Sequence, residues 1–495
     1  MQSVYEAALR SWSIPPAPTF AIGLSALVYL RGWWLLRRAG SPNVPPWRAV
    51  IFLLGLLSLW AALASPMDVF NSFVLTAHML QHMTLMMVAP PLILLGAPLV
   101  PMVRGLPIFA AREFAGPFLN WSVAKRVGST LTNPVFALLM GVAMFAWHTP
   151  ALYELALRSS TWHQVEHTCF LLTSLIFWWP VVQPWPSRAQ WPRWAMVPYL
   201  LIADLQNTAL SAILAFSDRV LYPSYSAVPR LFGFSALEDQ VAAGAIMWVV
   251  GSLAFVVPAI IIAIQCLSKR SWHEAIASVR PRETSPFGAF LFRPSGLPVF
   301  SRFVKLRWGG KRMEAVSFLV LFAAAALCFA GLLQAGSNDD DDQALRFNDT
   351  SGPFAVAVFA APGDLAAGAS EFSVLVRDRK TKDVLLDTTV DLTARLAVDS
   401  QGTSPSARAS NSSSPNKLLQ TAEVNLPLQG DWILAIAVWH NSDRVHFSVP
   451  FHVVMPEAGI EFPLFYVSIA VLSAILLAVY LGRRRSLHAE RPTSA

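Results

Sequence analysis

Two pairs of histidines stand at helical spacing in segments that are otherwise apolar. His78 and His82 lie in "TAHMLQHMTLMMVAPP", and His163 and His167 lie in "STWHQVEHTCF". Residues at i and i+4 share one face of a helix, so both rings of a pair can reach one ion. His148, in "MFAWHTP", lies at a similar predicted depth. Imidazole is the commonest metal ligand, and these five of the chain's ten histidines therefore predict a metal site.

Methionines surround these histidines in the sequence. Met144 lies one helical turn before His148, and Met247 lies two turns inside a later apolar segment. Thioether ligands favour Cu(I) over zinc. We therefore expect the ion to be copper, as Cu(I), although a methionine-rich helix is often only a well-packed one.

Two acidic residues occupy apolar surroundings and need partners. Asp204 forms a polar stripe with Asn207 and Ser211 in "IADLQNTALSA", and we expect this stripe to face the interior of the bundle. Asp239 begins a later apolar segment. It could orient an imidazole, or it could be an acid favoured by the dipole at a helix N-terminus.

Other chemistry is open to the same residues. "HQVEH" matches the inverted zinc peptidase pattern, in which Glu166 would act as general base, but five-residue patterns also arise by chance. Histidines on separate helices could instead hold a haem, or could hydrogen-bond between helices without any ligand. The convergence of two pairs and a fifth histidine favours a metal or haem site over the purely structural role.

Composition indicates an integral membrane protein. The 495 residues are 55% hydrophobic and only 14% charged, where a soluble domain carries about 25% charged residues. The net charge of +7 gathers in particular loops, so we read it as a topology signal and expect no nucleic acid partner. The three cysteines lie in apolar runs and form no disulfide framework.

The elements that position the histidines are expected to be transmembrane helices. A span needs about 20 mostly apolar residues. Nine segments qualify: 18–36, 47–65, 70–89, 134–150, 162–182, 194–216, 240–266, 314–335 and 462–481. Pro90 and Pro91 should kink or end the third. A start at Phe70 would put His78 roughly 12 Å into that span.

Basic residues fill alternate loops between these spans, whereas the loops "SPMDVFN" and "GFSALEDQ" are neutral or acidic. The positive-inside rule then places the N-terminus outside and the C-terminus inside a bacterial cytoplasmic membrane. We expect no removable signal peptide, because the first residues lack a basic segment and a cleavage site.

A soluble region interrupts the last two spans. After the acidic linker "SNDDDDQ", segments such as "FAVAVFA", "EFSVLVRD", "DWILAIAVWH" and "RVHFSVPFHVV" alternate apolar and polar residues. This pattern predicts a small extracytoplasmic β-sandwich, and the serine-rich piece 399–417 reads as a flexible loop inside it.

The expected fold is thus an all-α polytopic bundle of seven spans, plus two further spans flanking the β-sandwich. The predicted units are the bundle 1–267, a basic cytoplasmic loop 268–313, an eighth span 314–335, the β-sandwich 336–461, and a ninth span with a basic tail 462–495.

The motifs "HMLQHMTLMMVAPPLILLGAP", "WHTPALYELALRSSTWHQVEHTCFLLTSLIFWWPVV" and "YPSYSAVPRLFGFSALEDQVAAGAIMW" resemble the polytopic CtaG family of cytochrome c oxidase assembly proteins. The resemblance covers roughly residues 10–266. It implies a seven-span bundle that helps to mature a haem–copper oxidase at the copper-delivery step. The five histidines named above, with Asp239 and Gln240, fall on the family's motif positions.

The soluble region is similar to YtkA-like and FixH-like β-sandwiches, which accompany membrane copper and oxidase-assembly proteins. Its histidines, His440, His446 and His452, could bind copper in such a domain. Their spacing fits no compact site, so we expect them to be surface residues.

We therefore expect a non-enzymatic assembly factor without catalytic residues, which binds copper and delivers it to a cytochrome c oxidase subunit in the same membrane. A periplasmic copper chaperone is a candidate partner. The alternatives are a copper importer with a CopC-like outer domain, which Asp204 favours, a haem-binding membrane redox protein, and the zinc peptidase.

Overall fold

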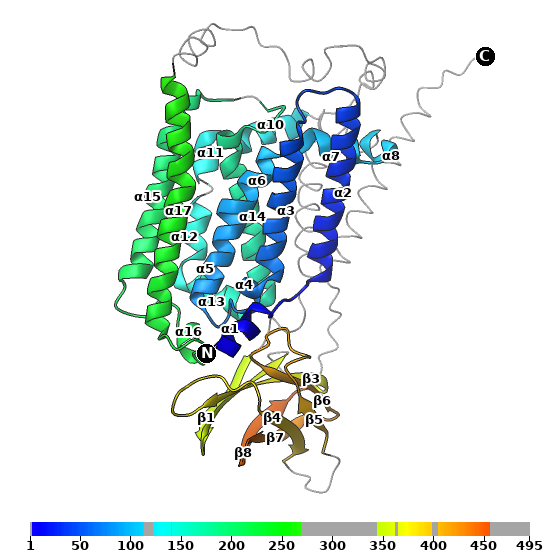
Figure 1. Ribbon diagram of the computed structural model, residues 1–495, viewed down its shortest axis with the longest axis vertical. Helices are drawn as coiled ribbons and strands as arrows, with labels where there is room; N and C mark the ends of the chain where they lie inside the picture. Colours follow the sequence, from blue (N-terminus) through cyan, green and yellow to red (C-terminus); the bar gives the residue numbers. More distant parts are fainter. Residues whose placement is uncertain are drawn as a thin grey trace, which may run out of the picture.

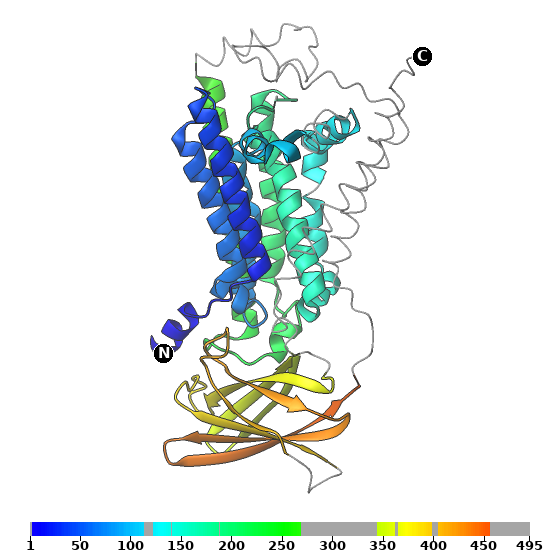
Figure 2. The same cartoon turned by 90° about the vertical axis from the view of Figure 1, so that its right-hand side faces the viewer.

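The chain divides into a helical region and a separate β-sheet region, as the sequence predicts. The computed structural model describes residues 2–112, 122–139, 141–187, 189–268, 344–361, 365–397 and 404–455. Long helices stand side by side above the strands, and helix α1 (Gln2–Leu9) lies where the two parts meet (Figures 1 and 2). The expected spans 314–335 and 462–481, the acidic linker and the basic loop from residue 269 onward lie outside the described residues.

Six helical segments of the described chain are long and apolar enough to cross a membrane. Three of them are single helices: α2 (Pro16–Arg38), α14 (Ser160–Val182) and α17 (Ala236–Leu267). The segment Pro46–Val69 comprises α3 (Pro46–Ala64) and α4 (Pro66–Val69), and the segment Arg193–Phe216 comprises η3 (Arg193–Ala195) and α15 (Met196–Phe216). The segment Leu75–Leu95 comprises α5 (Leu75–Met83), η1 (Thr84–Val88) and α6 (Ala89–Leu95). The protein is therefore a multi-span membrane protein.

The expected span 134–150 is not one continuous helix. It comprises α11 (Pro134–Leu139) and α12 (Val142–Trp147), separated at Gly141, and α12 ends at His148 before Pro150 begins α13 (Pro150–Arg158). Proline excludes the preceding residue from helical geometry, which explains the end at this point. The other short helices are α7 (Leu99–Gly105), α8 (Ile108–Ala110), α10 (Ser122–Leu131) and α16 (Ser224–Ala227).

Local sequence sets where the long helices begin. Pro16 and Pro46 occupy the first turns of α2 and α3, where a missing N–H costs nothing. Helix α17 begins with a capping box, in which the Ser235 side chain accepts from the Glu238 amide and the Glu238 carboxylate accepts from the Ser235 amide.

The third span departs from the prediction at both ends. It begins at Leu75, so His78 lies only about 4.5 Å along the helix from its start. It does not end at Pro90 and Pro91, because the π-turn η1 precedes them and α6 continues to Leu95. The Ala89 amide donates to the Thr84 carbonyl five residues back, a wider turn that carries the helix past the two prolines.

Helices α2 and α7 approach each other at two glycines. A Cβ atom on Gly32 would lie 1.8 Å from the Pro101 carbonyl oxygen, and one on Gly105 would lie 1.7 Å from the Val28 carbonyl oxygen. Close helix contacts of this kind in membranes require small residues.

We expect Gly32→Ala to force α2 and α7 apart and to lower the thermal unfolding midpoint in detergent by several degrees, because the backbone contact cannot accommodate a methyl group. Gly23→Ala in the same helix is the matched control. Among the described residues, no atom lies within 4 Å of its Cβ position, so it should leave the midpoint unchanged or raise it slightly. Equal effects of the two substitutions would contradict this packing.

The β region consists of two four-stranded antiparallel sheets. The first has the order β1 (Ala344–Ser351), β2 (Phe354–Ala361), β3 (Gly368–Asp378), β6 (Gln420–Leu426), and the second has the order β5 (Ser406–Ala409), β4 (Thr389–Leu396), β7 (Gly430–His440), β8 (Asp443–Val453). Segments that the sequence predicts as strands form β2, β3, β4, β7 and β8, although the β2 run is apolar throughout and does not alternate. Strand β5 lies within 399–417, so the prediction of a wholly flexible loop there is wrong.

One apolar core joins the two sheets, with side chains of β2, β3 and β6 packed against those of β4, β7 and β8. Strand β2 differs from the others because all eight of its residues are buried. Alternate side chains of a strand point to opposite faces, so both faces of this strand are covered. One face meets the second sheet, and the other meets the helical region.

Candidate metal centre

Four of the predicted ligands converge at one place. His78 and His82 extend from α5, and His163 and His167 extend from the first two turns of α14. One ligand nitrogen from each of the four lies within 4.8 Å of the others. Helices α5 and α13 lie at the end of the bundle that is nearer to the β region, so the four histidines lie at that end (Figure 1).

The donors face one another closely. The Nε2 atoms of His78 and His82 are 2.8 Å apart, and both lie 3.7–3.8 Å from Oε2 of Glu166. Among the described residues, neither Glu166 oxygen has a hydrogen-bond partner, and Nε2 of His163 and of His167 has none either. Each buried polar atom without a partner lowers the stability of the fold by about 1–3 kcal/mol, so this cluster is destabilising unless a ligand binds to these atoms.

An ion fits this arrangement. Donors that bind one metal at about 2 Å lie no more than about 4 Å apart, so small ring rotations would bring all four nitrogens to one centre. Glu166 is fully buried beside them and would offset the positive charge of an ion. The four imidazoles and one carboxylate can therefore hold a metal ion.

Tyr225, in α16, decides which nitrogen of His78 is free. Its hydroxyl lies 2.7 Å from the Asn71 carbonyl oxygen and 3.0 Å from His78 Nδ1. Burial raises the pKa of Tyr225 well above its usual range, so the hydroxyl keeps its proton and donates it to the carbonyl. His78 must then donate from Nδ1, which leaves the lone pair on Nε2 directed at the cluster.

Asp239 caps helix α5, and its hydrogen bonds within the described part of the chain go to the start of that helix and to no imidazole. Its carboxylate accepts from the amides of Leu75 (2.8 Å) and Thr76 (3.0 Å) and from the Thr76 hydroxyl (2.6 Å). We expected Asp239 either to orient an imidazole or to interact with the dipole of its own helix. It does lie in the first turn of α17, but its carboxylate caps the N-terminus of another helix, so neither role describes it fully. Asp239 thereby fixes the helix that carries His78 and His82.

His148 lies beside the four-histidine group and not within it. Its ring centroid is 6.3 Å from that of His82, and its Nδ1 donates to the Met144 carbonyl at 2.7 Å. Nε2 of His148 consequently carries a lone pair, which is buried without a partner among the described residues. This ring can serve as a neighbouring donor.

The methionines near the histidines pack against apolar side chains. Met79, Met83 and Met247 are buried in one apolar cluster, and Met144 packs against it.

In the polar stripe of α15, Asn207 and Ser211 are fully buried, and the Asn207 amide donates to the Met247 carbonyl. Asp204 is half-buried as a residue, but its Oδ1 is buried without a hydrogen-bond partner among the described residues, so its carboxylate is also turned inward.

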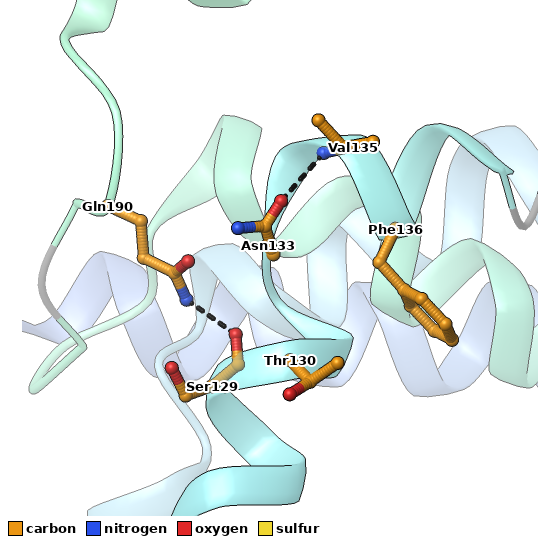
Figure 3. A pocket seen from close by; sticks show the side chains of 6 residues that line it. All are labelled: Ser129, Thr130, Asn133, Val135, Phe136 and Gln190. Carbon is orange, nitrogen blue, oxygen red and sulfur yellow. Dashed lines mark hydrogen bonds between the residues drawn. The ribbon is translucent and has the colours of Figure 1, made fainter.

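A separate hollow lies at the opposite end of the bundle, between α10, α11 and the Gln190 side chain (Figure 3). Gln190 donates to the Ser129 carbonyl at 2.8 Å and to the Thr132 hydroxyl at 3.0 Å. The residues that line it include no titratable side chain, so this hollow is not part of the metal centre.

The profile of the family described as cytochrome c oxidase caa3 assembly factor (Caa3_CtaG) matches residues 27–269. The membrane bundle belongs to the caa3 assembly factor family. The match contains both histidine pairs, His148 and Asp239, and confirms the resemblance seen in the sequence. It ends before the β region, whose likeness to YtkA-like and FixH-like domains stays a prediction.

Individual relatives are similar to this chain over a comparable length. An uncharacterized protein of Mycobacterium leprae is 29% identical over 262 residues, covering 51% of this chain and 39% of the relative. An uncharacterized protein of Mycobacterium tuberculosis is 27% identical over 263 residues, covering 48% and 39%. The chain thus spans about two fifths of the length of these relatives. No solved structure matches the chain.

We expect Asp239→Ala to lower the free energy of unfolding by about 1–3 kcal/mol, because two amide donors at the start of α5 would lose their acceptor. Chemical or thermal unfolding in detergent measures this. Asp431→Ala is the control, since that carboxylate is exposed and bonds to the exposed ring of His452. A loss no larger than that of the control would contradict the capping role.

Proposed function

We propose that this protein is a non-enzymatic assembly factor that binds copper, as Cu(I), and delivers it to a cytochrome c oxidase subunit in the same membrane. His78, His82, His163 and His167 would bind the ion, Glu166 would offset its charge, and His148 would be an adjacent donor. Transfer would proceed by exchange of ligands, so that the ion is never released into water.

The observation that carries this proposal is the convergence of four imidazole donors whose lone pairs are buried. Two helices far apart in the sequence supply them, and Tyr225 keeps the His78 lone pair on the side of the cluster. Copper is the natural cargo because a haem–copper oxidase is the assembly product that the family description implies. Soft metals such as Cu(I) accept imidazole ligands, and the methionines packed beside the site suit the same ion.

The geometry supports an ion better than the two other chemistries considered. Rings from separate helices lie close together, with centroids 5.2 Å apart for His78 and His163 and 5.4 Å apart for His82 and His167, which argues against a haem held between either pair. Glu166 is fully buried, which argues against a peptidase, whose general base must reach a substrate and a water molecule.

The same arrangement supports a direction of the chain in the membrane. Arg37 and Arg38 end α2 at the end of the bundle farthest from the β region (Figure 1). Under the positive-inside rule that end is cytoplasmic. The histidine site and the β region would then face the periplasm of a bacterial cytoplasmic membrane, where a copper chaperone could supply the ion.

Copper analysis of the purified chain tests the site. Loaded with Cu(I) under anaerobic conditions, the wild type should retain copper through desalting. His78→Ala and His167→Ala should each lower the affinity by at least about tenfold, because each removes a donor. The control is His446→Ala, an exposed histidine of the β region, which should retain the wild-type affinity. Copper binding that ignores both ligand substitutions would refute the proposed site.

Tyr225→Phe tests the supporting hydrogen bond. It keeps the aromatic packing but removes the acceptor of the His78 Nδ1 proton, so the ring can turn or change its tautomer. Loss of such an outer contact typically weakens metal binding by about 10–100-fold, and we expect that range here in competition titrations with a Cu(I) chelator. Tyr5→Phe, at a half-exposed tyrosine, provides the control and should show no change.

A further inference from the structure

The β region is packed directly onto the histidine end of the bundle. Ala357, Phe359 and Leu375, on the outer face of its first sheet, are buried in one cluster with Phe70 and Phe73 of the helical region. The Phe73 and Phe359 rings meet edge to face, with centroids 5.3 Å apart. Because Phe73 immediately precedes the N-cap of α5, this contact reaches the start of the helix that carries His78.

Polar contacts reinforce this docking. An Nη1 hydrogen of Arg377, in β3, bonds to the carbonyl oxygen of Arg230 at 3.3 Å. At a second point, the Lys417 amide donates to the Ser11 hydroxyl at 2.9 Å. The β region therefore contacts both the segment that follows α1 and the loop between α16 and α17.

Arg230 lies where the supports of His78 meet. Its guanidinium donates to the Tyr225 carbonyl oxygen and, at 3.2 Å, to that of Val228. The same guanidinium lies 4.0 Å from the Asp239 carboxylate. Asp239 caps α5, and the Tyr225 hydroxyl holds His78 Nδ1. Both groups that fix His78 thus depend on Arg230, whose own backbone is bonded to the β region.

We propose that docking of the β region positions the histidine site through Arg230. Arg230 is a positioning residue in this account, since it does not touch a candidate ligand directly. When the β region is docked, the loop that bears Arg230 is held, and with it the α5 cap and Tyr225. The consequence for copper affinity rests on the function proposed above, whereas the consequence for the order of α5 does not.

Hydrogen exchange on the full chain in detergent tests the coupling without any metal. The Leu75 and Thr76 amides report on the α5 cap, because both donate to Asp239. The Lys417 amide reports on docking, because it donates to Ser11 across the interface. Phe359→Asp, which places a charge in the apolar contact, and the milder Arg377→Ala should speed exchange at all three amides, by at least about tenfold for Phe359→Asp.

Arg230→Ala should speed exchange at Leu75 and Thr76. Arg408→Ala is the matched control, since it removes an exposed ion pair with Asp391 in the second sheet and should change none of the three amides. Fast exchange at Lys417 with full protection at Leu75 and Thr76 would overturn the proposal, because the β region would then be detached without effect on α5.

Cu(I) titration of the same variants completes the test. Phe359→Asp and Arg230→Ala should weaken binding by about tenfold while the copper content at saturation stays that of the wild type, because the ligands remain. Wild-type affinity in variants that have lost protection would overturn the link to the site. If the wild type itself bound no copper, yet the variants lost protection at α5, the function proposed above would fail and the structural coupling would stand.

Discussion

Several imidazole nitrogens are buried near one end of a membrane bundle, with their lone pairs turned toward one another. In such surroundings an unpaired polar atom cannot turn to water, and each one costs about 1–3 kcal/mol. Among the described residues, Nε2 of His148, His163 and His167 and both oxygens of Glu166 are in this position. A ligand that satisfied these atoms together would remove this cost, and a metal ion is a ligand of that kind.

The surrounding structure holds these groups in place. Asp239 caps α5 from another helix, Tyr225 orients His78, and the Met144 carbonyl orients His148. The π-turn after His82 lets the same span continue past two prolines. Each support acts on an element that carries a candidate ligand, which is the arrangement expected where a site must be rigid before the ion arrives.

The β region completes the same end of the molecule. Strand β2 is buried on both faces because the second sheet covers one and the helices cover the other. In an isolated two-sheet domain, one face of such a strand would be exposed to water. The run "FAVAVFAA" is apolar throughout, so its composition suits a docked position and not an isolated domain.

Sequence alone was enough to recognise the spans at 18–36, 162–182 and 194–216, the two histidine pairs, the main strands and the family, because each depends on local periodicity or on contiguous motifs. The division of 134–150 into α11 and α12 and the late start of α5 at Leu75 could not be read from hydropathy, because helix ends depend on caps. The cap of α5 comes from Asp239, more than 160 residues away. The role of Tyr225 was likewise hidden in "YPSYSAVP", since only the tertiary structure brings its hydroxyl to His78 and the β region to Arg230.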